Sequence, residues 1–311
     1  MSDHLGACKA RWGIARMSYM LSPGLYAIGT PTPESPVVVT ANYKMTYDIV
    51  RRTLAGCNTW MLVLETYGIN VWCAAGKGTF GTEEVVQRVT SSGLAQVVTH
   101  RQLILPILGA PGVAAHEVAK QCGFTVKYAS IYAAGLPKYL ENGMVTTAEM
   151  RKTRFSFYDR LVLIPVEVVL LLKSLAISSC LLFLVFAAFG GLSAGLEALA
   201  AYVGAVLSGT VLGPLLLPWL PTRSFAVKGA VVGLLWVSLF YYLAGENWPL
   251  LMAAAAFLIL PAVSAYYTLN FTGCTTYTSR SGVKKEMQIA LPVMGIAVMT
   301  GLMMVILSRF I

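Results

Sequence analysis

The pattern of apolar and polar positions divides the chain into two parts. Up to about residue 160, short apolar runs alternate with segments whose apolar residues recur at helical spacing. Such runs predict buried strands, and the segments between them predict amphipathic helices. Strands are expected at 36–42, 59–65, 95–100 and 124–130, and helices at 47–54, 81–93 and 112–123. Because strands that alternate with helices form a mostly parallel sheet covered on both faces, we expect an α/β, Rossmann-like domain.

Beyond residue 160 the apolar runs become much longer. A helix that crosses a membrane needs about 20 mostly apolar residues. Stretches of this kind lie at roughly 162–189, 192–217, 225–244, 248–268 and 288–308. The sequence therefore predicts two domains, an α/β domain at 1–160 and an all-α transmembrane domain of five helices at 161–311.

The basic residues between these stretches indicate how the chain crosses the membrane. Every second connection is basic, and together these connections carry Arg151, Lys152, Arg154, Arg160, Arg223, Lys228, Arg280, Lys284 and Lys285. The alternate connections contain no Lys or Arg. Because basic loops stay on the cytoplasmic side, we expect a multi-pass protein of the cytoplasmic (inner) membrane. Its N-terminal domain would lie in the cytoplasm and its C-terminus outside.

Composition narrows the classes of protein further. The chain is 57% hydrophobic and 12% charged, with a net charge of +9. The basic residues lie beside the spans and lack the interleaved aromatic residues of nucleic-acid-binding surfaces, so no nucleic-acid partner is expected. The six cysteines form no C-x-x-C pair, which argues against a zinc ribbon or a cysteine-ligated iron–sulfur cluster. Glu167, Lys173 and Glu197 lie within spans, but three scattered charges are not a transport pathway.

Parallel sheets bind ligands beyond the carboxyl ends of their strands. At the expected ends and in the "GAPG" turn of 109–112, the candidate ligand contacts are Thr40, Thr66, Thr99, His100, Gly109 and Pro111. Most of these residues are small or polar, which suits a broad ligand with hydrogen-bonding edges.

The stretch "NVWCAAGKGTFG" contains glycines at the spacing of a dinucleotide-binding turn, Gly76, Gly78 and Gly81. That fingerprint needs an acidic residue about 20 positions further on, and the strand expected there ends in Thr-His-Arg. A Walker phosphate loop needs Ser or Thr after its lysine, whereas Lys77 is followed by glycine. The nucleotide interpretation is therefore weak.

The cysteine of the same stretch is the other candidate. Cys73 lies ahead of a glycine-rich turn and near an expected helix start. A thiolate is a nucleophile and a soft metal ligand, and the adjacent small residues would let a flat cofactor approach the backbone. The alternative is a buried cysteine that acts as a small apolar side chain, and the residues alone leave both interpretations open.

The stretch "NVWCAAGK" resembles the signature of the HgcA family, the corrinoid proteins of microbial mercury methylation, and the lead-in "SYMLSPGLYAIGTPTPESPVVVTANYKMTYDIV" is similar to that family as well. The resemblance covers the whole chain. It implies a corrinoid-binding domain, related to the corrinoid/iron–sulfur proteins of acetyl-CoA synthesis, followed by five spans. The residues it assigns to a cap helix beneath the corrin ring are Asn70, Val71, Trp72, Cys73, Ala74, Ala75, Gly76 and Lys77. Cys73 would be the lower axial ligand of cobalt, with Trp72 and the small residues packed under the ring.

The resemblance also implies a function. The chain would be a membrane-anchored, corrinoid-dependent methyltransferase that passes a methyl group from cobalt to thiol-bound Hg(II), as a carbanion equivalent or a radical, and so forms methylmercury. The expected partner is a small ferredoxin with two 4Fe–4S clusters (HgcB type), and the methyl donor would come from the folate pathway. Cys274, in the connection 270–287, is a weaker candidate for relaying mercury.

Two other functions remain open on the sequence. One keeps the corrinoid and makes the chain a methyl carrier for one-carbon metabolism. The other is a membrane transporter or receptor with a nucleotide-binding cytosolic domain. An intact phosphate loop and a coherent polar pathway through the spans would favour the latter.

Overall fold

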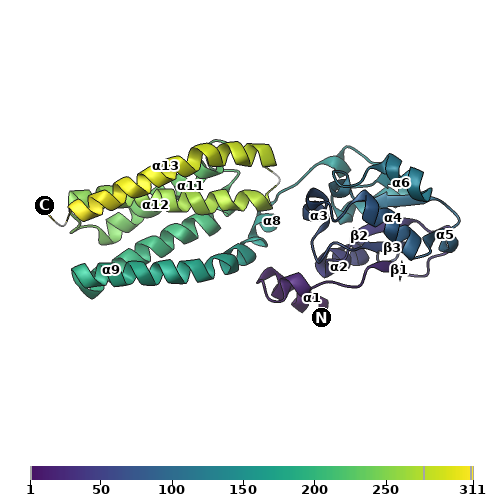
Figure 1. The fold of residues 1–311 in the computed structure, drawn as a ribbon, viewed down its shortest axis with the longest axis horizontal. Coiled ribbons are helices and arrows are strands. Elements are labelled where there is room, and N and C mark those ends of the chain that lie inside the picture. Colours follow the sequence, from purple (N-terminus) through teal and green to yellow (C-terminus); the bar gives the residue numbers. More distant parts are fainter. Residues whose placement is uncertain (1, 276, 309, 311) are drawn as a thin grey trace. The chain divides into compact units, whose positions relative to one another are not determined.

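The computed structural model describes residues 2–275, 277–308 and 310. The chain forms two compact units, Met1–Arg154 and Phe155–Ile311, and Figure 1 shows a mixed α/β arrangement in the first and a bundle of long helices in the second.

A five-stranded sheet forms the centre of the first unit, in the order β1-β3-β2-β4-β5. The strands are β1 (Gly24–Ile28), β2 (Val37–Ala41), β3 (Thr59–Leu64), β4 (Gln102–Leu105) and β5 (Thr125–Tyr128). Strands β2 to β5 pair in parallel, and β1 joins the edge of the sheet antiparallel to β3. The predicted mostly parallel sheet is confirmed. The edge strand β1 was not predicted.

Helices cover both faces of this sheet. One face packs against α2 (Lys44–Thr53) and α7 (Leu136–Glu141), and the other against α3 (Val71–Lys77), α4 (Thr82–Ser91) and α6 (Ala115–Cys122). Alternate residues of the three central strands β3, β2 and β4 enter the two cores, and every residue of β2 is buried. Complete burial explains why β2 reads as a continuous apolar run.

The remaining elements of the first unit are short. They are α1 (Ser2–Arg11), α5 (Leu94–Val97) and the 3₁₀ turns η1 (Arg16–Ser18), η2 (Ile107–Gly109), η3 (Ala133–Gly135) and η4 (Glu149–Arg151).

The strand predicted at 95–100 is wrong. Residues 94–97 form the short helix α5, and the strand is the next apolar run, β4. Leu94 and Val98, which are four positions apart, are both buried, whereas the residues between them are not. That is the spacing of a helical turn. The residue preceding α4 is Gly81, and the Thr82 hydroxyl accepts a hydrogen bond from Ala114 N.

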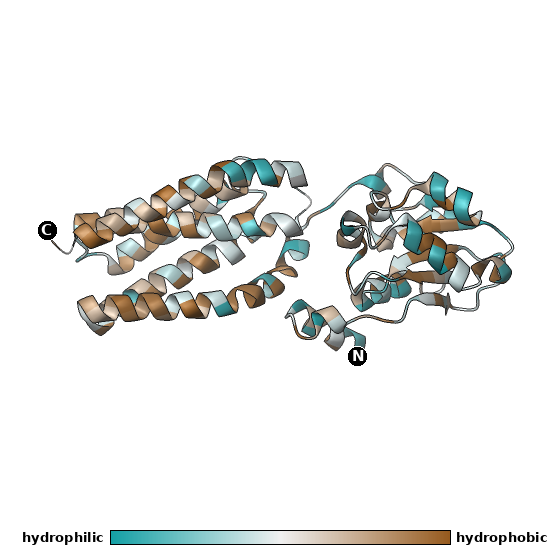
Figure 2. Cartoon of the chain, in the orientation of Figure 1, coloured by the Kyte–Doolittle hydropathy of each residue, from teal (hydrophilic) through white to brown (hydrophobic). Residues whose placement is uncertain are grey.

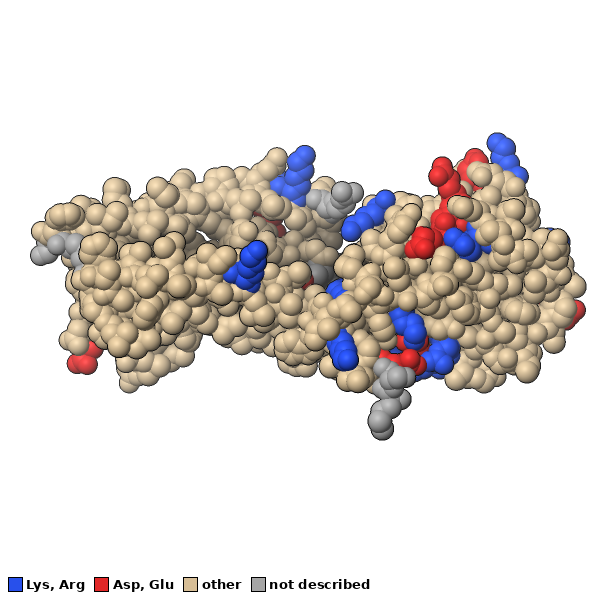
Figure 3. Space-filling view, turned by 60° about the horizontal axis from the view of Figure 1, so that its bottom comes forward, with Lys and Arg blue, Asp and Glu red and all other residues tan. Residues whose placement is uncertain are grey.

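Long apolar helices make up the second unit. In chain order its elements are α8 (Phe157–Leu161), α9 (Ile164–Leu207), the π-helical turn η5 (Ser208–Leu212), α10 (Gly213–Leu216), α11 (Phe225–Ala244), α12 (Leu250–Asn270), η6 (Phe271–Cys274) and α13 (Arg280–Leu307). Apolar residues cover these helices (Figure 2), and the face drawn in Figure 3 carries few charged side chains over them. The side chain of Cys274 lies outside the described part of the structure.

Within the described residues, four helical segments are long and apolar enough to cross a membrane, where five separate helices were predicted. The difference lies in the first of them, because α9 runs through both of the first two predicted spans. Gly191 breaks it with φ 79° and ψ 177°, a conformation open essentially only to glycine. The chain reverses there, and the Ser178 and Tyr202 hydroxyls on the two arms lie 2.9 Å apart. The two arms therefore correspond to the first two predicted spans, with the break at Gly191 between them.

Small residues let the second unit pack closely. An added Cβ at Gly229 would lie 2.6 Å from Ala265 Cα, and one at Gly233 would lie 2.7 Å from Pro261 Cα. The Ser264 hydroxyl on α12 donates a hydrogen bond of 2.8 Å to Gly229 O on α11. Close approach of small residues, joined by a hydroxyl hydrogen bond, is typical of helix pairs in lipid.

Candidate functional site

The strand order places a ligand-binding crevice next to β2. From β2 the chain moves to β3 on one side, and later crosses to β4 on the other side. The carboxyl ends of β2 and β4 flank this switch of direction, where open α/β sheets bind their ligands. A pocket of about 270 Å³ lies there. Its walls come from the strand ends, from α2 and from the start of α3, so the fold and the predicted cap segment converge at one place.

Thr40, the fourth residue of β2, lines this pocket, and its hydroxyl group forms no hydrogen bond among the described residues. The residue is 1% exposed. A buried hydroxyl without a partner is costly. The pocket therefore offers a hydrogen-bonding group that a ligand can satisfy.

Helix α3 carries the cysteine signature. Asn70 caps its N-terminus, and the Asn70 side-chain oxygen accepts a hydrogen bond of 2.9 Å from Cys73 N. Val71, Ala74 and Ala75 point into the core and are buried. The exposed residues of the same helix are Trp72, Cys73, Gly76 and Lys77. Cys73 is thus a free, exposed thiol, and the alternative of a buried cysteine is wrong.

The glycines after this helix have structural roles. Gly78 ends α3 with a φ of 84°, the left-handed conformation that glycine adopts most easily after a helix. The segment before Gly76 is helical, whereas a dinucleotide-binding turn follows a strand. The nucleotide interpretation of these glycines is therefore wrong.

The "GAPG" turn packs against the buried side of α3 and the residues that follow it. A Cβ at Gly109 would lie 2.5 Å from Phe80 Cε1, and one at Gly112 would lie 2.2 Å from Phe80 O and 3.0 Å from Ala75 Cα. These approaches are shorter than real contacts allow, so both glycines let the turn pack against the α3–α4 connection. Gly109 is accordingly buried, and Pro111 is exposed.

We expect Gly112→Ala to loosen α3 without touching any exposed side chain of that helix. The added methyl group meets backbone atoms that cannot rotate away, and overpacking of this kind costs about 1–3 kcal/mol. Hydrogen–deuterium exchange should show faster exchange of the amides of residues 74–80. The matched control is Gly76→Ala, where an added Cβ meets no described atom within 4 Å. Equal exchange in the two variants would contradict the packing role.

The structure brings together only part of the predicted contact set. Thr40, Asn70, Val71 and Trp72 line the pocket. Thr66 is fully buried and donates a hydrogen bond of 2.7 Å to Ile69 O, so it shapes the loop that leads to α3. The expectation that Ala74 and Ala75 lie under a bound ring is wrong, because both side chains pack in the core.

Thr99 and His100 lie at the end of the sheet where the parallel strands begin, opposite the end that carries the crevice. They precede β4 instead of ending a strand. The ring nitrogen Nε2 of His100 lies 2.9 Å from Ser35 O, and Thr99 N donates a hydrogen bond of 2.9 Å to Pro33 O. Both partners precede β2, so these residues cannot share the crevice with Thr40. The misplaced strand at 95–100 caused this error.

The sequence analysis missed several residues of the pocket. They are Val38, Val39, Thr46, Ile49, Val50, Pro106, Leu108, Ser130, Ile131, Tyr132, Ala133 and Leu136. Ser130 could have been found, because it ends the run predicted as the last strand. Tyr132 could not, since its place depends on tertiary contacts: its hydroxyl accepts a hydrogen bond of 2.7 Å from Arg154 N.

The donor set restricts which metal the site can hold. Among the described residues, no group of three or more His, Cys, Asp and Glu side chains is placed to hold a metal ion. A single thiolate such as that of Cys73 can complete the coordination of a metal that already carries other ligands. The larger pocket of about 970 Å³ in the second unit is lined mainly by apolar residues of α11, α12 and α13 and offers no described thiol.

Comparisons with known proteins show what the N-terminal region of the chain is similar to. Residues 15–133 match the family described as "CO dehydrogenase/acetyl-CoA synthase delta subunit". The acetyl-CoA decarbonylase/synthase complex subunit gamma of Methanopyrus kandleri is 33% identical over 123 residues, which are 39% of this chain and 26% of that protein. The subunit gamma of Archaeoglobus fulgidus is 35% identical over 97 residues, which are 30% of this chain and 21% of that protein.

The matched segments span about a quarter of the length of those two relatives. The family match stays within the first unit and includes β1 to β5 and the α3 helix. The N-terminal region of the chain is therefore related to the gamma and delta subunits of these acetyl-CoA-forming and acetyl-CoA-cleaving complexes.

Proposed function

We propose that the first unit binds a corrinoid at the outer face of α3 and that the chain is a methyl-transfer protein. The observation that carries this proposal is the exposed thiol of Cys73, one residue beyond the part of α3 that lines the crevice. A corrinoid brings cobalt already held by the ring, which suits a site that offers one soft ligand. The relation to acetyl-CoA decarbonylase/synthase subunits supports it.

The residues present fit such a group. Gly76 leaves the α3 surface open next to Cys73, because an added Cβ there meets no described atom within 4 Å. Trp72 offers an exposed apolar surface on the same helix. The unpartnered hydroxyl of Thr40 can bind a polar edge group of the ligand. The site therefore offers a flat cofactor with polar edges three things: a sulfur atom that can coordinate its metal, an open surface and a hydrogen-bonding group.

Each residue has a separate role in this proposal. Cys73 would ligate the cobalt, and the hydrogen bond from Cys73 N to Asn70 fixes the helix start that carries the thiol. Trp72 would exclude water from one side of the ligand. When bound, the corrinoid supplies the cobalt that takes up and releases a methyl group.

We propose thiol-bound Hg(II) as the methyl acceptor. The support is the eight-residue signature at 70–77, which resembles that of the mercury-methylating HgcA family. An axial thiolate donates electron density to its metal, and the axial ligand is how a protein tunes such a cofactor. This favours release of the methyl group to an electrophile. The ferredoxin partner, the folate-derived methyl donor and a cytoplasmic position of the first unit belong to the same proposal.

The test uses the full chain, purified without oxygen and loaded with a methylated corrinoid. Thiol-bound Hg(II) is added, and methylmercury is measured against time, beside the Co(II) EPR spectrum of the wild type and of Cys73→Ala. The proposal requires methylmercury formation and a cobalt signal that differs between the two proteins. A wild type that binds no corrinoid would refute the whole assignment.

A second function is favoured by the relatives themselves. Their membership of acetyl-CoA decarbonylase/synthase complexes makes a methyl carrier for one-carbon metabolism the alternative. If the loaded wild type transfers its methyl group to a tetrahydrofolate acceptor and not to Hg(II), the carrier function replaces mercury methylation.

A further inference from the structure

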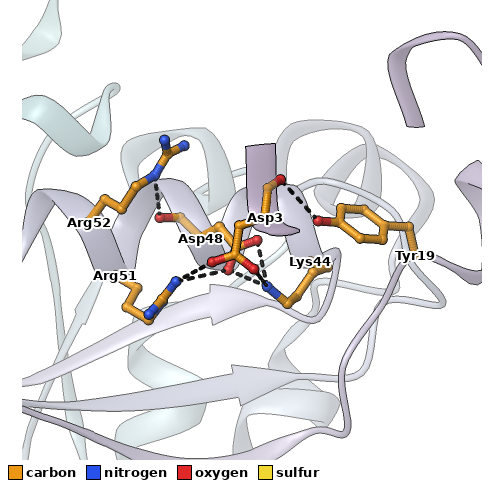
Figure 4. A network of polar contacts seen from close by, with 6 residues as sticks. All are labelled: Asp3, Tyr19, Lys44, Asp48, Arg51 and Arg52. Carbon is orange, nitrogen blue, oxygen red and sulfur yellow. Dashed lines mark hydrogen bonds and ion pairs between the residues drawn. The ribbon is translucent and has the colours of Figure 1, made fainter. Parts of the chain in front are cut away.

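The N-terminal arm, residues 5–20, is held against the first unit by polar contacts at its base. Asp3, just before the arm, accepts hydrogen bonds from Lys44 at 3.2 Å and Arg51 at 2.6 Å, both on α2 (Figure 4). Asp48, which is nearly fully buried, holds the same lysine. The hydrogen bond and charge of Lys44 lower the pKa of Asp3, so these contacts are complete at neutral pH. They are lost when the pH falls through that lowered pKa.

The inner side of α1 packs on the rest of the arm. Ala10 is fully buried, and its carbonyl accepts a hydrogen bond of 3.2 Å from Arg16. An added Cβ at Gly6 would lie 2.5 Å from the hydroxyl of Tyr19. The orientation of the helix is thus fixed by both its base and its inner face.

Large apolar side chains occupy the outer side of the arm. Leu5 and Cys8 on α1 and Trp12 just after it are exposed and follow one another at helical spacing. The arm continues with Ile14 and Met17, which are 59% and 68% exposed. These side chains form the apolar stripe of the arm, and His4 and Lys9 of α1 are exposed as well. Large exposed apolar residues that gather on one segment mark an interaction site.

The charge of the arm indicates what lies against that stripe. Residues 4–20 include Lys9, Arg11 and Arg16 and contain no Asp or Glu. A basic segment with apolar residues and a tryptophan on its free side is typical of binding to a membrane interface with anionic lipids. The chain also passes directly from Arg154 in the first unit to Phe155 in the second. A membrane that held the second unit would keep the first unit close to its surface.

We propose that the N-terminal arm inserts Trp12, Ile14 and Met17 into the headgroup layer of a membrane that contains anionic phospholipid. Lys9 and Arg11 bind the lipid phosphates. The inference does not depend on the corrinoid or on mercury. Its consequence for the site is geometric: a Cβ at Gly68 would lie 3.1 Å from Met17 O, so the end of the arm packs against the loop that leads to α3. An arm bound to lipid would therefore fix α3 relative to the membrane surface.

The test measures the fluorescence of Trp12 in the full chain, reconstituted in lipid nanodiscs. Nanodiscs of phosphatidylcholine are compared with nanodiscs that also contain phosphatidylglycerol, each with and without lipid brominated on the acyl chain. Subtracting the spectrum of Trp12→Phe isolates the emission of Trp12 from that of the other tryptophans. Because Trp12 is half exposed, this substitution should leave the fold intact.

With phosphatidylglycerol present, the brominated lipid should quench the Trp12 emission by about half or more. The quenching should weaken in phosphatidylcholine alone and in the double variant Lys9→Gln, Arg11→Gln. Two outcomes would overturn the proposal. Quenching of Trp12 by aqueous acrylamide but not by brominated lipid would place the arm in water. Quenching by neither reagent would place it against protein.

Discussion

Replacing Cys73 with alanine should lower the rate of methyl transfer to Hg(II) on the order of 100-fold, which is roughly 2.7 kcal/mol in activation free energy. The variant removes the only thiol among the residues of α3, which is the cobalt ligand in the proposed function. The side chain is exposed, so its loss leaves no cavity, and the fold should remain unchanged. Methylmercury formation per corrinoid-loaded protein is the measurement, because it separates transfer from loading.

Two further variants make this result specific. Cys8→Ala removes another exposed thiol and should leave the rate unchanged, which controls for mercury bound by any surface cysteine. Cys73→His offers cobalt a nitrogen ligand that donates less charge than a thiolate. It should give a nitrogen-split Co(II) EPR signal with an intermediate rate. A Cys73→Ala protein that transfers methyl at the wild-type rate would leave corrinoid binding possible but remove the axial role of the thiol.

The parts of the fold that could be predicted are those in which one sequence pattern corresponds to one environment. Strands β2 and β3 are buried on both faces, so each is a continuous apolar run with clear ends. The long apolar runs of the second unit are equally unambiguous, because only a helix satisfies so many backbone groups in lipid. The glycine after α6 ends its helix as predicted, with Gly123 in the left-handed conformation.

The errors arose where a short pattern fits two structures. Residues 95–100 contain two adjacent valines, typical of a strand, yet Val98 is buried by the helical turn that begins at Leu94. The break in α9, by contrast, lies where it was predicted. The first two spans were expected to end and begin on either side of residues 190 and 191, and Gly191 interrupts the helix there.

The sequence was enough to predict where the candidate site lies, but not which of its side chains face outward. The signature located α3 and its thiol, but only the structure shows which residues face outward. Ala74 and Ala75 are small because they pack against the sheet, whereas Gly76 is small although nothing described lies near it. Packing therefore explains the small size of two of these three consecutive residues and does not explain that of the third.

That difference gives a prediction in which stability and binding change in opposite directions. Glycine in an exposed helix costs about 0.5–1 kcal/mol relative to alanine, so Gly76→Ala should raise the stability of α3. Leucine is also a good helix former, and the space around position 76 is open, so Gly76→Leu should fold as well as the wild type. Its side chain, however, would project from the face that carries Cys73 and would hold a flat ligand away from the helix.

We expect Gly76→Leu to weaken corrinoid binding by about 10- to 100-fold, equivalent to roughly 1.4–2.7 kcal/mol, and Gly76→Ala to weaken it less. Absorbance titration of the purified full-length protein measures the affinity, and hydrogen–deuterium exchange of α3 measures local stability. Gly295→Leu is the matched control, because Gly295 is also a helical glycine with open surroundings but lies on α13 in the second unit. Wild-type affinity in Gly76→Leu would show that the ring does not lie over this face, and Cys73 would then have to act without a ligand packed on α3.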